Sequence, residues 1–207
     1  MKEAKTVDNQ TKKEAKAVDN QTKKEAKAVD NQTKIPDLVY TAMGVALICV
    51  CSWISIPMPV PFTLQTFAVP VVLLLLGGKR GTMATVIYVI MGAIGIPVFA
   101  GFTGGPGILF GSTGGYIIGF IFMGLIYMIS TREFGNKKKT QIISLIVGLI
   151  ICYAFGTAWF MHIYLRDSGE VGLFTVLTWC VFPYIIPDLV KIFLAAVVSD
   201  RVKRFVV

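Results

Sequence analysis

Apolar residues are concentrated in six segments that follow a hydrophilic start to the chain. They cover residues 38–56, 62–77, 80–96, 111–130, 140–165 and 172–199. Because a helix needs about 20 residues to cross the hydrocarbon core of a bilayer, the pattern predicts an all-α integral membrane bundle of six transmembrane helices. The second and third segments are short and contain Pro70 and several glycines, so we expect them to be tilted, broken or only partly spanning.

Basic residues alternate with these segments. Basic residues lie at the start of the chain and at residues 79–80, 132–139 and 201–204. If the chain crosses the membrane six times, these alternate loops and both termini all lie on the same side. The opposite side has one arginine and two acidic residues within 166–170. The positive-inside rule then predicts a multi-pass protein of the cell membrane with both termini in the cytoplasm. The net charge of +8 does not indicate nucleic-acid binding, because the basic clusters flank apolar segments.

The hydrophilic start is an 11-residue repeat. Three nearly identical units occupy residues 2–12, 13–23 and 24–34. Each unit offers too few apolar side chains to bury against a neighbour. We therefore predict two parts, a disordered hydrophilic tail over 1–34 and a membrane domain over 35–207. A weak interaction of the tail lysines with a membrane surface is an alternative.

Signatures of catalysis or metal binding are absent from the sequence. The four cysteines lie within apolar segments and lack the spacing of zinc ligands. The chain also lacks a phosphate-binding G-x-x-x-x-G-K-[ST] loop, an H-E-x-x-H pair and a G-x-S-x-G elbow. We expect no enzyme activity, no metal and no cofactor, so uphill transport would draw its energy from another subunit or from an ion gradient.

Two loops on the predicted outer side are unusual. Residues 55–65 contain three prolines within five positions, which indicates a stiff extended link. Residues 95–116 form a long glycine-rich loop that is apolar and aromatic. Either loop can be an ordinary turn, but long loops in compact domains are more often functional. We interpret them as a lid or a pocket wall.

Asp188 and Lys191 are the most informative residues, because they lie inside the last apolar segment. Ionisable side chains at membrane depth are expensive and usually face a bundle interior or a cavity. Their i, i+3 spacing places both on one face of a helix. They either form a purely structural ion pair or bind a small polar ligand, and we favour the ligand.

Several motifs resemble the BioY family, the biotin-specific substrate-binding membrane subunits (S components) of energy-coupling factor (ECF) transporters. The matching stretches are PFTLQ at 61–65, KRG at 79–81, GIPVFAG at 95–101, TGGYIIGF at 113–120, and the late motif formed by Tyr184, Pro187, Asp188 and Lys191. The resemblance covers about residues 36–200. The repeated tail departs from the family pattern, as does Ser112, where a proline is expected.

The resemblance implies a high-affinity biotin-binding subunit whose transport is energised by partner proteins. The expected partners are a transmembrane coupling subunit and two ABC-type ATPases, and the loaded subunit is expected to topple in the membrane. Ala42 and Ala46 match the A-x-x-x-A pattern with which such subunits contact the coupling subunit. Small residues four apart are a weak signal alone, but they allow close helix approach.

The resemblance also implies a set of substrate-binding residues. Asp188 would accept hydrogen bonds from the ureido N–H groups of biotin, and Lys191 would donate to the ureido oxygen or to the carboxylate. The remaining expected contacts come from the two loops and the start of the fourth segment: Thr63, Gln65, Phe99, Gly101, Phe102, Thr113 and Tyr116.

Three other functions remain open. The chain could be a stand-alone secondary carrier or channel for a small organic anion, although we find no internal inverted repeat. It could be a membrane-embedded enzyme, although it lacks a nucleophile–base pair, or a scaffold whose repeated tail is the working part. Tight binding of biotin by the isolated chain would separate the biotin-binding subunit from all three.

Overall fold

The computed structural model describes residues 35–58, 60–168 and 172–206. The predicted tail of residues 1–34 lies outside the described residues. The chain divides into the units Met1–Val39 and Tyr40–Val207.

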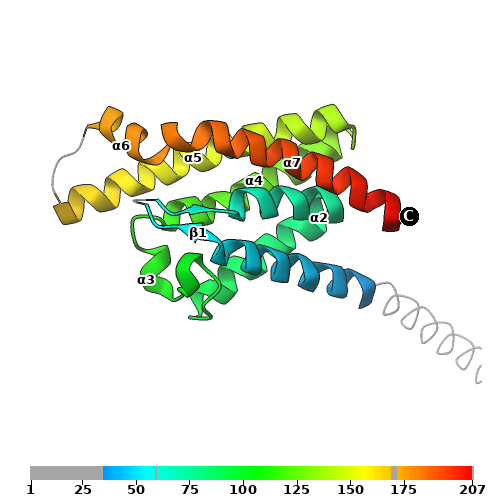
Figure 1. The fold of residues 1–207 in the computed structure, drawn as a ribbon, viewed down its shortest axis with the longest axis horizontal. Helices are drawn as coiled ribbons and strands as arrows, with labels where there is room; N and C mark the ends of the chain where they lie inside the picture. Colours follow the sequence, from blue (N-terminus) through cyan, green and yellow to red (C-terminus); the bar gives the residue numbers. More distant parts are fainter. Residues whose placement is uncertain (1–34, 59, 169–171, 207) are drawn as a thin grey trace, which may run out of the picture. The chain divides into compact units, whose positions relative to one another are not determined.

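Helices make up most of this part of the chain, as the apolar pattern predicts (Figure 1). An N-terminal helix, Ile35–Trp53, is followed by a hairpin of two short antiparallel strands. The elements after that helix are β1 (Ser55–Ile56), β2 (Phe62–Thr63), α2 (Gln65–Ala93), η1 (Ala100–Phe102), α3 (Pro106–Leu109), α4 (Gly114–Glu133), α5 (Lys138–Ser168), α6 (Leu173–Cys180) and α7 (Phe182–Val206).

Among the described residues, five continuous helical stretches are long and apolar enough to cross a membrane. The predicted second and third spans are merged into one of them, α2, because no loop separates them. Gly77 breaks α2 with φ 80° and ψ 169°, a conformation that residues with a side chain rarely adopt. A Cβ on Gly81 would lie 2.8 Å from the Cα of Leu73, so the two halves of α2 fold sharply against each other. The prediction of six helical spans is confirmed, with a one-residue reversal in place of the expected loop.

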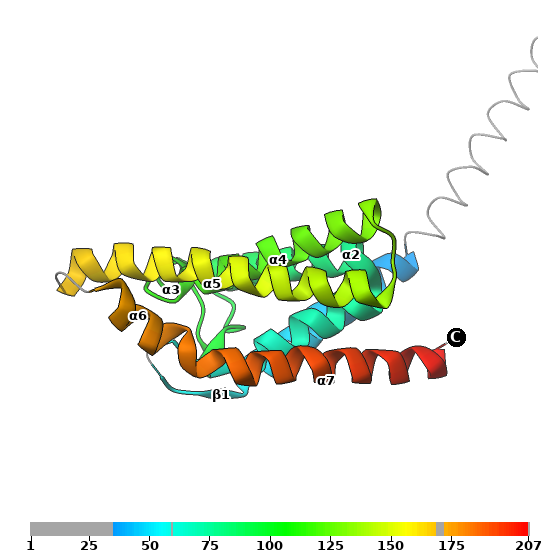
Figure 2. The same ribbon diagram turned by 90° about the horizontal axis from the view of Figure 1, so that it is seen from above.

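Glycines bring α4 and α5 into close antiparallel contact. Gly115 faces Gly156, Gly119 faces Cys152, and Met123 faces Gly148, so the contacts step along both helices in opposite directions. Figures 1 and 2 show the two helices side by side. Small residues at such positions let helix backbones approach closely where the surrounding lipid offers no hydrophobic driving force.

The glycine-rich loop packs on the end of the N-terminal helix and on α2. The Trp53 indole N–H donates to the Pro97 carbonyl at 2.8 Å, and its ring stacks on Phe102 with centroids 4.9 Å apart. The Phe99 ring lies where a Cβ on Gly92 would be. These contacts hold one wall of the cavity described below.

We expect Gly78→Ala to destabilise the fold, because its Cβ would lie 2.6 Å from the Met128 Cα and would push α2 away from α4. Overpacking of this kind costs roughly 1–3 kcal/mol. Thermal unfolding of the purified protein, followed by intrinsic fluorescence, measures the effect. Gly107→Ala is the matched control, since nothing lies within 4 Å of its Cβ position. Equal melting temperatures for the two variants would contradict the close approach.

Candidate functional site

A cavity of about 270 Å³ lies between the strand hairpin, the glycine-rich loop and helices α2, α4, α5 and α7. This is close to the lower end of the range for small-molecule sites, roughly 300–1,000 Å³. The structure brings seven of the predicted substrate-binding residues to its lining: Thr63, Gln65, Phe99, Thr113, Tyr116, Asp188 and Lys191. These residues come from distant parts of the sequence, so the fold itself assembles the site.

Two residues that were expected to contact the substrate are not among the lining residues. Gly101 is not among the lining residues, although its neighbour Ala100 and the nearby Thr103 are. Gly101 and Phe102 both have positive φ, 66° and 59°. Phe102 is 63% exposed and stacks on Trp53. Residue types alone do not reveal this local backbone conformation.

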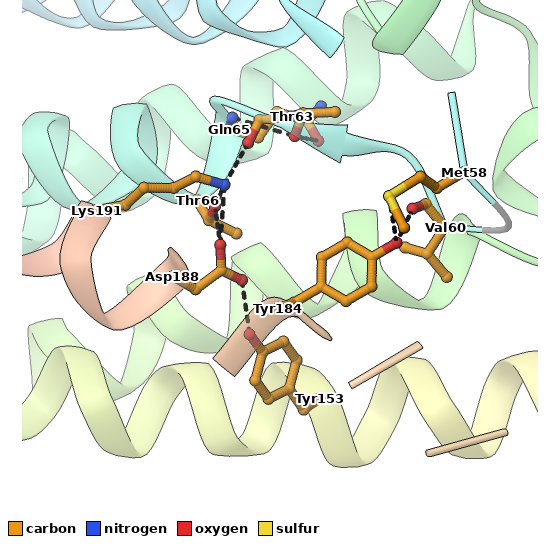
Figure 3. Close-up of polar contacts among 9 residues, drawn as sticks. All are labelled: Met58, Val60, Thr63, Gln65, Thr66, Tyr153, Tyr184, Asp188 and Lys191. Atoms are coloured by element: carbon orange, nitrogen blue, oxygen red, sulfur yellow. Dashed lines mark hydrogen bonds and ion pairs between the residues drawn. The ribbon is translucent and has the colours of Figure 1, made fainter. Parts of the chain in front are cut away.

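Asp188 and Lys191 form a buried ion pair on α7, with Nζ 2.9 Å from Oδ1. Their side chains are only 4% and 9% exposed. A buried pair offsets its desolvation only when further hydrogen bonds satisfy the remaining groups. Figure 3 shows that this pair is the centre of such a network.

Lys191 uses all three of its N–H donors within the protein. Besides Asp188, it donates to the Thr63 carbonyl at 2.7 Å and to the Thr66 hydroxyl at 2.9 Å. The ammonium also lies 3.7 Å from the centroid of the Phe62 ring, a favourable cation–π contact. In this arrangement Lys191 has no donor left for a ligand, so its first role is to hold the hairpin and α2 against α7.

Asp188 retains acceptor capacity. Its Oδ1 accepts from Lys191 and, at 2.7 Å, from the Thr66 hydroxyl, while Oδ2 accepts from the Tyr153 hydroxyl at 2.6 Å. A carboxylate has about four lone-pair positions, so one remains on Oδ2. Since Asp188 lines the cavity, that position can accept a hydrogen bond from a ligand N–H or O–H.

Thr66 and Tyr153 were missed by the sequence reasoning. Both line the cavity and both donate to Asp188. Thr66 directly follows the PFTLQ stretch. Tyr153 places a hydroxyl group in the middle of a long apolar segment. A polar group at that depth needs a partner, and this requirement was the signal available for Tyr153.

The strand hairpin is tied to α7 at two points. The Tyr184 hydroxyl donates to the Val60 carbonyl, and Lys191 donates to the Thr63 carbonyl (Figure 3). Val60, Pro61 and Thr63 all line the cavity. The proline-rich loop therefore forms a wall of the cavity, and two side chains of α7 hold it in place.

Gln65 lines the cavity, but its amide is occupied. Its Nε2 donates to Ser52 Oγ at 2.8 Å and to the Tyr88 hydroxyl, while Oε1 accepts from the Thr63 hydroxyl at 3.1 Å. These bonds join the N-terminal helix, the hairpin and both halves of α2. Gln65 therefore acts mainly to position its neighbours.

The rest of the lining is largely apolar and aromatic. Phe99, Ile108, Ile117 and Phe120 contribute hydrocarbon surface, and the Tyr116 hydroxyl is paired with Thr157 at 3.1 Å. The lining contains one cation and one anion, which neutralise each other. The cavity thus suits a neutral, partly apolar ring system with a few N–H donors. Among the described residues, no three His, Cys, Asp or Glu side chains are grouped as a metal site requires.

The Lys191→Met substitution should destabilise the protein strongly, because it leaves the Asp188 carboxylate buried without its cation. Breaking a buried pair by removing one partner costs roughly 3–5 kcal/mol, and adding Asp188→Asn should recover part of the loss. Melting temperatures of the wild type, the two single variants and the double variant form a double-mutant cycle, which measures the coupling between Asp188 and Lys191. Lys138→Met, which breaks an exposed ion pair with Asp200, is the control and should cost at most about 1 kcal/mol. Purely additive effects at 188 and 191 would show that the pair is not coupled.

Comparison with known proteins gives consistent matches over the membrane part. Residues 21–207 match the BioY family. The chain is 39% identical over 171 residues to the biotin transporter BioY of Thermotoga maritima, covering 81% of this chain and 95% of that protein. It is 37% identical to the probable biotin transporter BioY of Pyrococcus horikoshii, covering 82% and 98% of the two chains.

A solved structure agrees with these matches. The crystal structure of the S component for biotin from an ECF-type ABC transporter is similar to this fold, with a TM-score of 0.73 and 26% identity. The similarity covers 84% of this chain and 94% of the other. From the helical spans, the buried ion pair beside a cavity and the extent of these matches, we conclude that the chain is a multi-pass membrane protein of the BioY family.

Proposed function

We propose that this protein is the substrate-binding membrane subunit for biotin uptake and that biotin occupies the cavity beside Asp188. The observation that carries the proposal is a carboxylate with one open acceptor position in a largely apolar cavity without net charge. The names of the relatives support it, since they are described as biotin transporters and as an S component for biotin. They are transporters rather than enzymes, in agreement with the expectation that the chain is not an enzyme.

The chemistry of biotin matches the lining. Its ureido group offers N–H donors to Asp188 Oδ2, and its thioether ring fits the surface of Phe99, Ile117 and Phe120. Because the donors of Lys191 are already used, Lys191 acts on biotin mainly by orienting Asp188 and Thr66. The lining has no second cation for the biotin carboxylate, so this end of the ligand is held by neutral groups or lies towards the opening. Thr113 is the lining hydroxyl that can donate to it, since the Thr103 hydroxyl already donates to the Ala100 carbonyl at 2.9 Å.

We further propose that the protein works in the cell membrane with a transmembrane coupling subunit and two ABC-type ATPases. The description of the similar structure as part of an ECF-type ABC transporter supports such an assembly. Ala42 and Ala46 lie exposed, one turn apart, on the N-terminal helix. Their small side chains leave a shallow face on which another helix can pack closely.

Asp188→Asn should weaken biotin binding at least about tenfold, equivalent to roughly 1.4 kcal/mol, because it replaces an anionic acceptor with a neutral amide. Calorimetric titration of the purified chain with biotin, and with thiamine and riboflavin as competing vitamins, measures this. Asp200→Asn is the matched control, since that carboxylate pairs with Lys138 and does not line the cavity. Unchanged affinity in Asp188→Asn, or equal affinity for the three vitamins, would refute the site.

Ala42→Trp should prevent assembly with the coupling subunit while leaving biotin binding intact, because a bulky ring would fill the shallow face. Co-purification of the complex and biotin titration of the isolated subunit give the two readouts. Met43→Trp, at a neighbouring exposed position of the same helix, is the control and should assemble normally. Loss of biotin binding in Ala42→Trp would indicate instead that this helix shapes the cavity.

A further inference from the structure

A small recess lies between α2, the first part of α5 and the last part of α7, and it shares no lining residue with the biotin cavity. Its volume is about 30 Å³. The first part of α5 meets the last part of α7 here, as the contact between Lys138 and Asp200 shows (Figure 2). Leu74 of α2 closes the third side. We refer to this feature as the terminal recess.

Ser199 gives the terminal recess an unsatisfied polar group. The residue is only 2% exposed, it lines the recess, and its hydroxyl has no hydrogen-bond partner among the described residues. Buried hydroxyl groups are nearly always paired with protein or with ordered water. The hydroxyl is therefore available to donate to an oxygen that enters the recess.

The charges of the terminal recess leave one cation available. The Lys138 ammonium lies 2.7 Å from Asp200 Oδ2, so these two neutralise each other. Lys203, which also lines the recess, forms no ion pair with any described residue. The net charge of the lining is therefore positive, and further basic residues are close by in the sequence at 137, 139, 201 and 204. An anion is the complementary occupant.

The remaining wall is apolar. Leu74, Ile142 and Ala196 line the terminal recess, and Ile142 is 39% exposed. In a membrane protein, exposed surface of this kind faces acyl chains. A free anion gains nothing from such a wall, whereas an amphipathic molecule uses both the cation and the hydrocarbon surface. Basic pockets between transmembrane helices at the cytoplasmic side are known to bind anionic lipid head groups.

We propose that the terminal recess binds an anionic phospholipid. One phosphate oxygen accepts a hydrogen bond from the Ser199 hydroxyl, Lys203 supplies the complementary charge, and an acyl chain lies against Ile142 and Ala196. By the positive-inside rule this end of the bundle faces the cytoplasm, where the leaflet carries anionic lipids. This proposal does not depend on the identity of the transported substrate.

Native mass spectrometry of the full chain in detergent, titrated with phosphatidylglycerol, tests the proposal. Lys203→Gln should weaken retention of a single lipid about fivefold, the effect of one basic side chain near a membrane surface. Ser199→Ala should weaken it as well. Lys139→Gln removes the same charge from an exposed position outside the recess and should leave the affinity unchanged.

Four outcomes would overturn the proposal. Equal losses in Lys203→Gln and Lys139→Gln would indicate a diffuse attraction to the basic end of the bundle. Unchanged lipid retention in Ser199→Ala would show that the phosphate does not enter the terminal recess. Equal retention of phosphatidylcholine with the same acyl chains, or displacement of the lipid by an excess of inorganic phosphate, would show that no anionic phospholipid site exists. The melting temperature of each variant serves as the folding control, so the test does not depend on biotin binding.

Discussion

The need to satisfy a carboxylate and an ammonium away from water organises the membrane part of this protein. Neither charge could remain at that depth without partners. The hairpin, α2, α5 and α7 each supply a partner or a charge, through the Thr63 carbonyl, the Thr66 hydroxyl, the Tyr153 hydroxyl and the pair itself. The same hydrogen bonds that make the pair tolerable therefore bring the walls of the cavity together.

The network is nearly complete but leaves one position unused. Lys191 has no donor to spare, while Asp188 Oδ2 can accept one more hydrogen bond. In the proposed function, a neutral ring with an N–H donor would complete the network without bringing a charge to Asp188. The two residues would then have different roles, with the lysine holding protein segments together and the aspartate accepting from the ligand.

Much of the fold followed from the apolar pattern, including the six helical spans and a division between the second and third next to Gly77, at residues 78–80. What the pattern could not show was that this division is a reversal within one helix, since a single positive φ decides it. At the site, the ion pair and most lining residues were predicted from their depth and from family motifs. Gly101, expected among the binding residues, is not among the lining residues, and Thr66 and Tyr153 were missed, because local backbone conformation and contacts between distant segments determine which residues line the cavity.

The sequence alone determined that the chain is a membrane protein with helical spans and a buried acid and base. The length of each apolar segment and the presence of charged residues within it can be read from the order of residues, without knowledge of tertiary contacts. Its motifs also indicated the family. Tertiary structure decided which groups share the hydrogen bonds of that pair, that Gln65 and Lys191 position the walls, and that Ser199 and Lys203 line a second recess. These contacts depend on how helices far apart in the sequence pack together. The partner of each side chain is defined only by that packing.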